Sequence, residues 1–219
     1  MTEPAGRNST PRVFRVGLTG GIATGKSLVA EVFQERGAFI LDSDKLGHEL
    51  MEPGMPAFHE IRRSFGEGIL DLDGKIDRKK LGSRVFQDET ARRRLNEILH
   101  PLILAEAHRR VADLAERSPG SIVVTQAALL MEAGVVKRFD RIVMTDCDAE
   151  SQIRRLIDRD AISAEEALRR VRAQADPAQR RKIADILVDT SGTPEESRAN
   201  ASQAFDKLRR EWEALRSKP

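Results

Sequence analysis

The sequence has only one cysteine, Cys147, among its 219 residues. A single cysteine cannot form an internal disulfide, and no cluster of cysteine and histidine surrounds it that would bind zinc. Disulfide scaffolds and zinc-stabilised folds are therefore excluded. We expect Cys147 to be a small core residue near the end of a strand.

Long apolar runs are missing as well. No segment approaches the roughly 20 consecutive apolar residues that span a bilayer, and the N-terminus lacks the apolar core of a signal peptide. Residues 1–12 are polar and contain two prolines, which is typical of a disordered leader. We expect a cytoplasmic protein without a membrane partner.

Neither sign of charge dominates, because 37 lysines and arginines face 35 aspartates and glutamates and leave a net charge of +2. This balance gives no general reason to expect nucleic-acid binding, although local basic clusters can hold an anionic small molecule. Internal repeats and low-complexity tracts are also missing. With 40% hydrophobic residues, the chain can bury a substantial core as one large domain or as a core with an insertion.

What the sequence does contain is a glycine-rich stretch at residues 20–27, GGIATGKS, which matches the phosphate-binding pattern G-x-x-x-x-G-K followed by S or T. The apolar run 13–19 before it predicts a strand, and the apolar spacing after it predicts a helix. Glycines allow the loop to aim its N–H groups inward, where the positive end of the helix also favours a polyphosphate. The alternative, a glycine-rich turn that happens to precede Lys-Ser, does not account for both flanks.

We therefore expect this stretch to bind a nucleoside triphosphate together with Mg²⁺. Lys26 would bridge the outer phosphates, and Ser27 would place its hydroxyl on the metal ion. The expected nucleotide-binding residues are Gly21, Ile22, Ala23, Thr24, Gly25, Lys26, Ser27 and Leu28.

The rest of the chain alternates between helical patterns and four further apolar runs, at 38–41, 121–125, 141–145 and 186–188. This alternation predicts parallel pairing with right-handed crossovers. The expected fold is a three-layer α/β/α sandwich of the P-loop nucleoside triphosphate hydrolase type, with a five-stranded parallel sheet around the first strand.

Two segments interrupt the expected core, which comprises 13–43, 118–148 and 184–219. Residues 44–117 are helical and too long for a simple crossover, so they predict an inserted acceptor-binding subdomain. Its longest helix contains Pro101, where we expect a kink or a restart. Residues 149–183 are rich in arginine and predict a lid.

Capping patterns predict helix starts in the second half of the chain. Ser163 with Glu166, Asp176 with Gln179, and Thr193 with Glu196 have the required spacing. The last of these helices has an apolar face that includes the single tryptophan, Trp212, which we expect to be a packing residue.

The second strand ends in two carboxylates, Asp42 and Asp44. In open α/β sheets, ligands bind at the carboxyl ends of the strands. Asp44 is therefore suited to take the proton of an acceptor hydroxyl, and Asp42 to orient a water bound to Mg²⁺. The alternative is that Asp44 only caps a helix beginning at Lys45.

In the predicted lid, Gln152, Arg155 and Arg159 fall on one helical face. Guanidinium groups clamp phosphate oxygens well, and a mobile lid would exclude water from the reaction. A solvated, charged helix face explains the same spacing equally well.

Other classes of phosphate-loop protein fit less well. Residues 71–74 match the GTPase pattern D-x-x-G, but no apolar strand precedes them and no N-K-x-D motif follows, so we expect a surface turn. A motor ATPase would have a strand ending in an acidic pair, whereas the third strand here ends in Thr125-Gln126. These absences favour a kinase acting on a small hydroxylated acceptor.

Together, these features resemble the dephospho-coenzyme A kinases of coenzyme A biosynthesis. The matching pieces appear in the family's order and cover the chain from about Val13 to Leu208. They are GLTGGI at 17–22, GKS at 25–27, DSD at 42–44, LHPLI at 99–103, Leu129-Leu130 with Glu132, Gln152 with Arg155, Arg159 and Asp160, Ala173-Gln174, Ala184-Asp185 and Val188-Asp189.

The resemblance implies transfer of the ATP γ-phosphate to the ribose 3′-hydroxyl of dephospho-coenzyme A, with Mg²⁺, giving coenzyme A and ADP. It assigns catalysis to Asp44, Lys26 and Arg155, and adds Arg159 to the ATP site. Candidates for acceptor binding are Thr19, His48, Arg78 and Lys79. We expect ATP and dephospho-coenzyme A as the partners of a monomer or small homo-oligomer. A kinase for another small hydroxyl or nucleoside monophosphate acceptor, and a regulatory nucleotide-binding module, remain alternatives.

The sequence departs from the family's usual residues at four positions. Ala23, Ala128, His48 and Thr190 stand where glycine, proline, arginine and asparagine are common. Ala23 places a β-carbon in the phosphate loop, which is harmless if its φ is helical or extended. His48 weakens the case for an acceptor-phosphate contact at that position.

Overall fold

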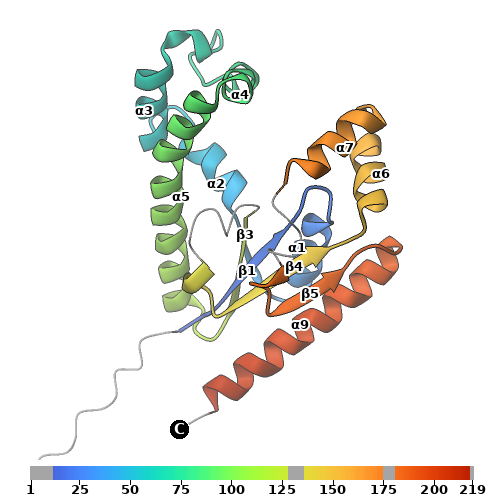
Figure 1. Ribbon diagram of the computed structural model, residues 1–219. Helices are drawn as coiled ribbons and strands as arrows, with labels where there is room; N and C mark the ends of the chain where they lie inside the picture. Colours follow the sequence, from blue (N-terminus) through green and yellow to red (C-terminus); the bar gives the residue numbers. More distant parts are fainter. Residues whose placement is uncertain (1–11, 128–135, 175–180, 218–219) are drawn as a thin grey trace, which may run out of the picture. The chain divides into compact units, whose positions relative to one another are not determined.

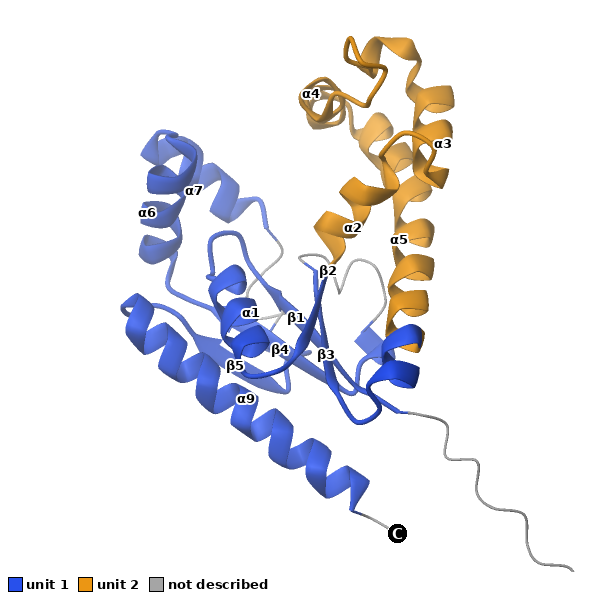
Figure 2. Ribbon diagram, turned by 180° about the vertical axis from the view of Figure 1, so that it is seen from behind, with its two compact units in different colours: residues 1–41, 113–219 blue, residues 42–112 orange. Residues whose placement is uncertain are grey.

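A computed structural model describes residues 12–127, 136–174 and 181–217. The expected leader up to residue 11, the departure at Ala128 and the expected helix start at Asp176 lie outside these ranges. The chain divides into two compact units, one formed by residues 1–41 with 113–219 and the other by residues 42–112 (Figure 2).

The first unit is built on a five-stranded parallel sheet with the strand order β2-β3-β1-β4-β5, so the first strand lies at its centre as predicted (Figure 1). Each strand lies within one residue of the run that predicted it. The strands are β1 (Phe14–Gly20), β2 (Phe39–Asp42), β3 (Ile122–Gln126), β4 (Arg141–Asp146) and β5 (Ile186–Asp189).

The register of the sheet brings three strand ends together. Gly20 at the end of β1 pairs with Thr145 of β4, and Asp146 of β4 pairs with Asp189 of β5. The residues that follow β1, β4 and β5 therefore emerge side by side at the carboxyl edge of the sheet. This edge is where ligands of open α/β sheets bind.

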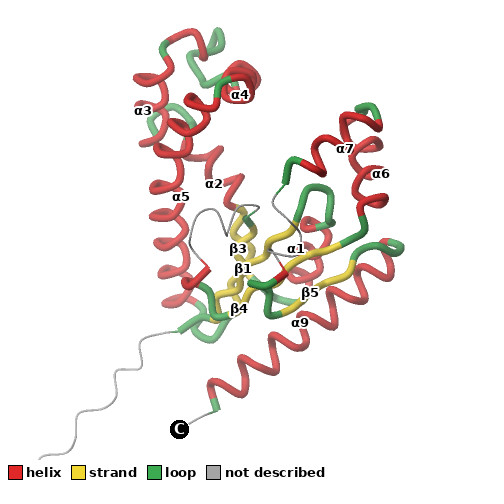
Figure 3. Tube along the Cα trace, in the orientation of Figure 1, coloured by secondary structure: helices red, strands yellow, loops and turns green. Residues whose placement is uncertain are grey.

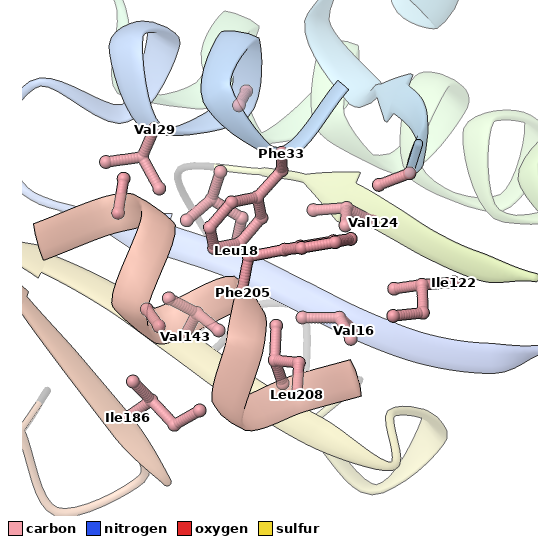
Figure 4. Packing of buried hydrophobic residues seen from close by; sticks show 14 of the residues in the cluster. Val16, Leu18, Val29, Phe33, Ile122, Val124, Val143, Ile186, Phe205 and Leu208 are labelled. Atoms are coloured by element: carbon pink, nitrogen blue, oxygen red, sulfur yellow. The ribbon is translucent and has the colours of Figure 1, made fainter. Parts of the chain in front are cut away.

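Helices α1 (Lys26–Glu35) and α9 (Pro194–Arg216) cover one face of this sheet and close the main core. Figure 4 shows Phe33 of α1 and Phe205 of α9 meeting above β1, with ring centroids 5.3 Å apart. Val123 and Met144 point to the opposite face and are also buried. Burial on both faces is what a parallel sheet requires.

Trp212 packs against the core at the start of β1, which confirms that it is a packing residue. Its ring stacks on Phe14 with centroids 5.2 Å apart, and its Nε1–H donates to the carbonyl of Gly120 at 2.6 Å. Only 4% of the residue is exposed.

Helices α6 (Ala149–Asp160) and α7 (Ala164–Arg172) follow β4, and a short 3₁₀ helix, η2 (Val136–Arg138), precedes it. The capping predictions are confirmed where they can be followed. Ser163 Oγ accepts from the N–H of Glu166 at 3.2 Å, and Thr193 and Glu196 form a complete capping box at the start of α9.

The second unit is helical, as Figure 3 shows. Its elements are α2 (Ser43–Leu50), α3 (Pro56–Phe65), the 3₁₀ helix η1 (Glu67–Ile69), α4 (Arg78–Gln87) and most of α5 (Glu89–Arg117). Its own core joins Phe58, Ile61 and Phe65 of α3 to Leu81 of α4. Helix α5 packs against this core through Leu95, Ile98, Leu99 and Leu102.

Helix α5 runs without interruption through Pro101, so the restart expected there does not occur. Pro101 and Glu97, whose carbonyl loses its N–H partner, are both exposed. Water can bond to a carbonyl on the solvent side of a helix, which lowers the cost of the missing hydrogen bond. None of the described helices, α5 included, is long and apolar enough to cross a membrane.

The D-x-x-G sequence forms an exposed turn, as predicted. Asp71 Oδ1 accepts from the N–H groups of Asp73 and Lys75, each at 2.9 Å, and the Asp71 N–H donates to the carbonyl of Lys75. An aspartate that bonds its own following backbone is a common way to build a turn.

Substitutions at Trp212 test its role in the core. Trp212→Ala is expected to lower the free energy of unfolding by about 3–5 kcal/mol, because it leaves a cavity against Phe14. Trp212→Phe keeps an aromatic ring there and loses chiefly the hydrogen bond to Gly120, at a cost of about 1 kcal/mol. Urea unfolding followed by circular dichroism measures both, and equal losses for the two variants would contradict the packing described.

Candidate active site

The loop between β1 and α1 depends on two glycines. Gly20 has φ +153°, and a β-carbon there would lie 2.1 Å from Thr145 Oγ1, so no larger residue fits. Gly25, the N-cap of α1, has φ +74° and adopts the left-handed conformation. The chain can therefore turn directly from the end of the central strand into the helix.

Ala23 also has a positive φ, of +57°. Alanine at this position, where the family usually has glycine, is therefore not harmless, because its φ is neither right-handed helical nor extended. A left-handed conformation costs an alanine about 1 kcal/mol relative to its preferred regions. The only other such non-glycine residue in the described ranges is Ala161, with φ +51°.

The side chain of Lys26 folds over the loop that precedes it. Its Nζ donates to the carbonyls of Gly20 at 2.8 Å and Gly21 at 2.9 Å. The ammonium group is thus held at the first turn of α1, close to the N–H groups of the loop. A polyphosphate at this position would meet both the lysine and the positive end of the helix.

Three buried threonine hydroxyls support the loop from behind. Thr24 Oγ1 donates to the carbonyl of Gly21 at 2.9 Å and lies 2.7 Å from Thr145 Oγ1. Thr190, which follows β5, has its Oγ1 3.0 Å from the carbonyl of Thr24 and 3.1 Å from that of Asp146. All three threonines are at most 1% exposed. The hydroxyls link the loop to the ends of β4 and β5.

Arg155 of α6 reaches the same loop. Its Nη1 donates to the carbonyl of Ala23 at 3.3 Å, and its Nη2 donates to the carbonyl of Thr190. The side chain is half-buried, so a solvated helix face does not describe it. Arg155 is therefore positioned to place positive charge beside the loop.

Arg159, one turn further along α6, is placed differently. It is exposed, and its guanidinium forms two hydrogen bonds with Asp160, at 2.7 and 3.1 Å. This pairing raises the pKa of Arg159 and lowers that of Asp160. The structure does not bring Arg159 to the loop, so its part in ATP binding stays a prediction.

Cys147 is buried beside this cluster, at 8% exposure, directly after β4. Burial raises the pKa of its thiol above the ordinary value, although nearby Arg155 acts in the opposite direction. A buried, protonated thiol is unreactive. The prediction of a core residue near a strand end is confirmed.

Gln174, just after α7, makes a contact that no sequence pattern predicts. Its Oε1 accepts from the N–H of Ile22 in the loop at 2.7 Å. The two residues are 152 positions apart. The family resemblance includes Gln174 but implies no role for it.

In the second unit, Asp42 and not Asp44 caps the helix. Asp42 Oδ1 accepts from the N–H groups of Asp44 at 2.9 Å and Lys45 at 3.2 Å, and α2 begins at Ser43. The reading of Asp44 as merely the cap of a helix starting at Lys45 is therefore wrong. Asp44 lies exposed in the first turn of α2.

The candidate acceptor residues fall into separate places. His48 Nδ1 and Arg78 Nη1 lie 3.2 Å apart and are both exposed, so the second unit brings these two side chains together. Lys79, also exposed, donates its backbone N–H to the cap residue Asp77. Thr19 belongs to β1 of the first unit and is 4% exposed.

The described residues contain no group of three or more His, Cys, Asp or Glu side chains that could hold a metal ion. This arrangement is compatible with Mg²⁺, which is commonly held by substrate phosphates, water and one or two protein oxygens. Ser27, exposed in the first turn of α1, can supply a hydroxyl of this kind.

Comparison with known proteins decides among the classes of phosphate-loop protein. The family model described as dephospho-CoA kinase matches residues 14–196. The chain belongs to the dephospho-CoA kinase family.

The similarity extends over most of the chain. A dephospho-CoA kinase of Geobacter sulfurreducens is 45% identical over 181 residues, which cover 83% of this chain and 91% of that protein. One from Shouchella clausii is 40% identical over 198 residues, covering 90% and 100%. The solved dephospho-CoA kinase of Campylobacter jejuni, at 23% identity, supports the same fold with a TM-score of 0.61 and covers 89% of this chain and 96% of its own.

Ala23→Gly tests the strain in the loop of this family member. Glycine adopts a positive φ freely but gains entropy in the unfolded chain, so we expect a net stabilisation of up to about 1 kcal/mol. Ala161→Gly is a matched control with nearly the same φ outside the loop, and it should stabilise by a similar amount. Urea unfolding measures both. A clear destabilisation by Ala23→Gly alone would show that the alanine methyl makes a favourable contact in the loop.

Thr190→Val tests the support behind the loop, because valine keeps the shape of threonine but has no hydroxyl. The carbonyl of Thr24 loses its hydroxyl partner, while that of Asp146 keeps the backbone N–H of Thr190, so the free energy of unfolding should fall by about 1–3 kcal/mol. Nucleotide binding should weaken with it. Thr190→Ser retains the hydroxyl and should restore most of both. If serine and valine behave alike in unfolding and in nucleotide titrations, the hydrogen bonds are not what matters.

Proposed function

We propose that this protein transfers the γ-phosphate of ATP to the ribose 3′-hydroxyl of dephospho-coenzyme A, giving coenzyme A and ADP. This reaction completes coenzyme A biosynthesis. The observation that carries the proposal is the match to the dephospho-CoA kinase family over residues 14–196, which includes an intact phosphate loop with Lys26 and Ser27.

Most of the groups that would bind ATP belong to the first unit. Lys26 Nζ now bonds two loop carbonyls, and phosphate oxygens with a full negative charge can replace these neutral acceptors. The N–H groups of Gly21 to Leu28 would donate to the same phosphates. Mg²⁺, held by the phosphates with Ser27 and, through water, Asp42, would neutralise charge on the β- and γ-phosphate oxygens.

Arg155 would contribute positive charge on the other side of the loop. Its guanidinium is fixed by the carbonyls of Ala23 and Thr190, so little side-chain freedom is lost when phosphate arrives. Phosphoryl transfer depends mainly on positioning and on stabilising charge that is spread over the transferred group. Arg159 would join the ATP site if residues 149–183 act as a lid over it.

Asp44 would accept the proton of the acceptor hydroxyl as the bond to phosphorus forms. It is exposed, and Asp42 fixes the backbone of the turn that carries it. A carboxylate is a sufficient base for this step, because the hydroxyl becomes acidic as its oxygen donates electron density to phosphorus. His48, Arg78, Lys79 and Thr19 remain the candidates for holding the acceptor.

The product of the purified protein tests the proposal. With ATP, Mg²⁺ and dephospho-coenzyme A, mass spectrometry should show coenzyme A, and a coupled assay should show ADP in equal amount. A panel of other hydroxyl and nucleoside monophosphate acceptors should give much slower turnover. Preferred phosphorylation of one of these, with dephospho-coenzyme A left unchanged, would overturn the substrate assignment.

Asp44→Asn tests the base in the same assay. The amide cannot take the proton, so kcat should fall by a factor on the order of 100 or more, while the dissociation constant for ATP stays nearly unchanged. Asp73→Asn, at an exposed aspartate of the same unit, should leave kcat unaltered. Turnover by Asp44→Asn close to that of the unaltered protein would remove Asp44 from the chemistry.

A further inference from the structure

The contact between Gln174 and Ile22 joins the end of α7 to the phosphate loop. The carboxamide oxygen of Gln174 accepts from the Ile22 N–H at 2.7 Å, and both residues belong to the first unit. Ile22 lies between Gly21, whose carbonyl bonds Lys26, and Ala23, whose carbonyl bonds Arg155. The contact therefore falls at the middle of the loop.

The carboxamide is held from its other end as well. Its Nε2 donates to the carbonyl of Val171 at 3.3 Å, and the backbone N–H of Gln174 points to the same carbonyl at 3.4 Å. The preceding residue, Ala173, is the C-cap of α7, and its N–H bonds back to the carbonyl of Arg169. Because a backbone N–H can only donate, the side-chain oxygen is the end that must face Ile22.

This oxygen accepts hydrogen bonds as a phosphate oxygen does, but more weakly. Loop N–H groups bind polyphosphate by donating to its oxygens, and a carboxamide oxygen is an acceptor with a partial negative charge. The Ile22 N–H cannot donate well to both at once. A phosphate with a full charge makes the stronger bond, so it should displace the glutamine. The net gain in binding free energy is smaller, because the bond between Gln174 and Ile22 is broken.

We propose that Gln174 is a positioning residue that competes with nucleotide phosphate for the Ile22 N–H. Before nucleotide arrives, the side chain satisfies this donor and fixes the direction in which it points. When nucleotide binds, the bond breaks and releases the end of α7 from the loop. The inference rests on the proposed function only in taking residues 20–27 as the nucleotide site.

If Gln174 competes with phosphate, removing its side-chain oxygen should strengthen nucleotide binding and not weaken it. Gln174→Met has nearly the same length and no acceptor oxygen, so it removes the competitor and should lower the dissociation constant for ADP by roughly 2- to 10-fold, the range for losing one hydrogen bond. Gln174→Glu places a carboxylate against the same N–H and beside the phosphates, so it should raise the constant. A residue that only supports the fold would give no gain in affinity with either change.

Calorimetric titration of the full chain with ADP measures these constants without reference to turnover. Gln34→Met, on the exposed side of α1, is the control for the substitution itself and should bind like the unaltered protein. Hydrogen exchange gives a second readout, since the Ile22 N–H should exchange faster in Gln174→Met than in the unaltered protein when no ADP is present. If Gln174→Met does not fold, Gln174→Leu takes its place.

The outcomes distinguish a failure of the competition from a failure of the nucleotide site. Weaker or unchanged ADP binding by Gln174→Met, in a protein that unfolds like the original, would overturn the competition while leaving the kinase assignment intact. An unaltered protein that binds neither ADP nor ATP would instead refute the nucleotide site and the proposed function with it. Tighter binding by Gln174→Met together with weaker binding by Gln174→Glu supports the proposal.

Discussion

A phosphate loop has to aim several backbone N–H groups and a lysine ammonium into one small volume, and these positive ends repel one another until an anion joins them. In this protein, neutral acceptors meet part of that demand. The carbonyls of Gly20 and Gly21 accept hydrogen bonds from Lys26, and the carboxamide oxygen of Gln174 accepts one from the Ile22 N–H. These acceptors hold the donors in place at a lower strength than phosphate, so they keep the loop in shape without preventing exchange.

The buried hydroxyls behind the loop matter for a related reason. Loop carbonyls that turn away from the ligand need partners inside the protein, because a buried carbonyl without one costs about 1–3 kcal/mol. Thr24 serves the carbonyl of Gly21, and Thr190 serves that of Thr24. Both threonines sit where the sheet register places the ends of β4 and β5 next to the loop. The parallel sheet thus determines the loop through side chains as well as through the direction of β1.

The sequence predicts the sheet well and these contacts poorly, because a strand has a local pattern in the sequence and a long-range contact has none. Apolar runs such as 141–145 are bounded by polar residues on either side, so a local pattern suffices to find β4. By contrast, Thr190 meets Thr24 across 166 positions, and nothing local to either threonine marks the pairing. That α5 continues through Pro101 without a restart is not evident from the sequence, because it depends on whether water reaches the Glu97 carbonyl, which only the folded helix reveals. Capping by Asp44 is wrong because α2 begins at Ser43, two residues before the expected start at Lys45.

The positive φ of Ala23 shows how long-range hydrogen bonds can offset the local free-energy cost of an unfavourable backbone conformation. The left-handed conformation costs about 1 kcal/mol, whereas a hydrogen bond from a charged donor contributes about 1.5–3 kcal/mol. Arg155 donates such a bond to the Ala23 carbonyl, and it also bonds Thr190, which in turn supports Thr24. An alanine at this position is therefore compatible with a phosphate loop when the neighbouring peptide group is fixed from outside. In a protein without an arginine at this place in α6, the same alanine would have only its own backbone preferences, which favour a different φ.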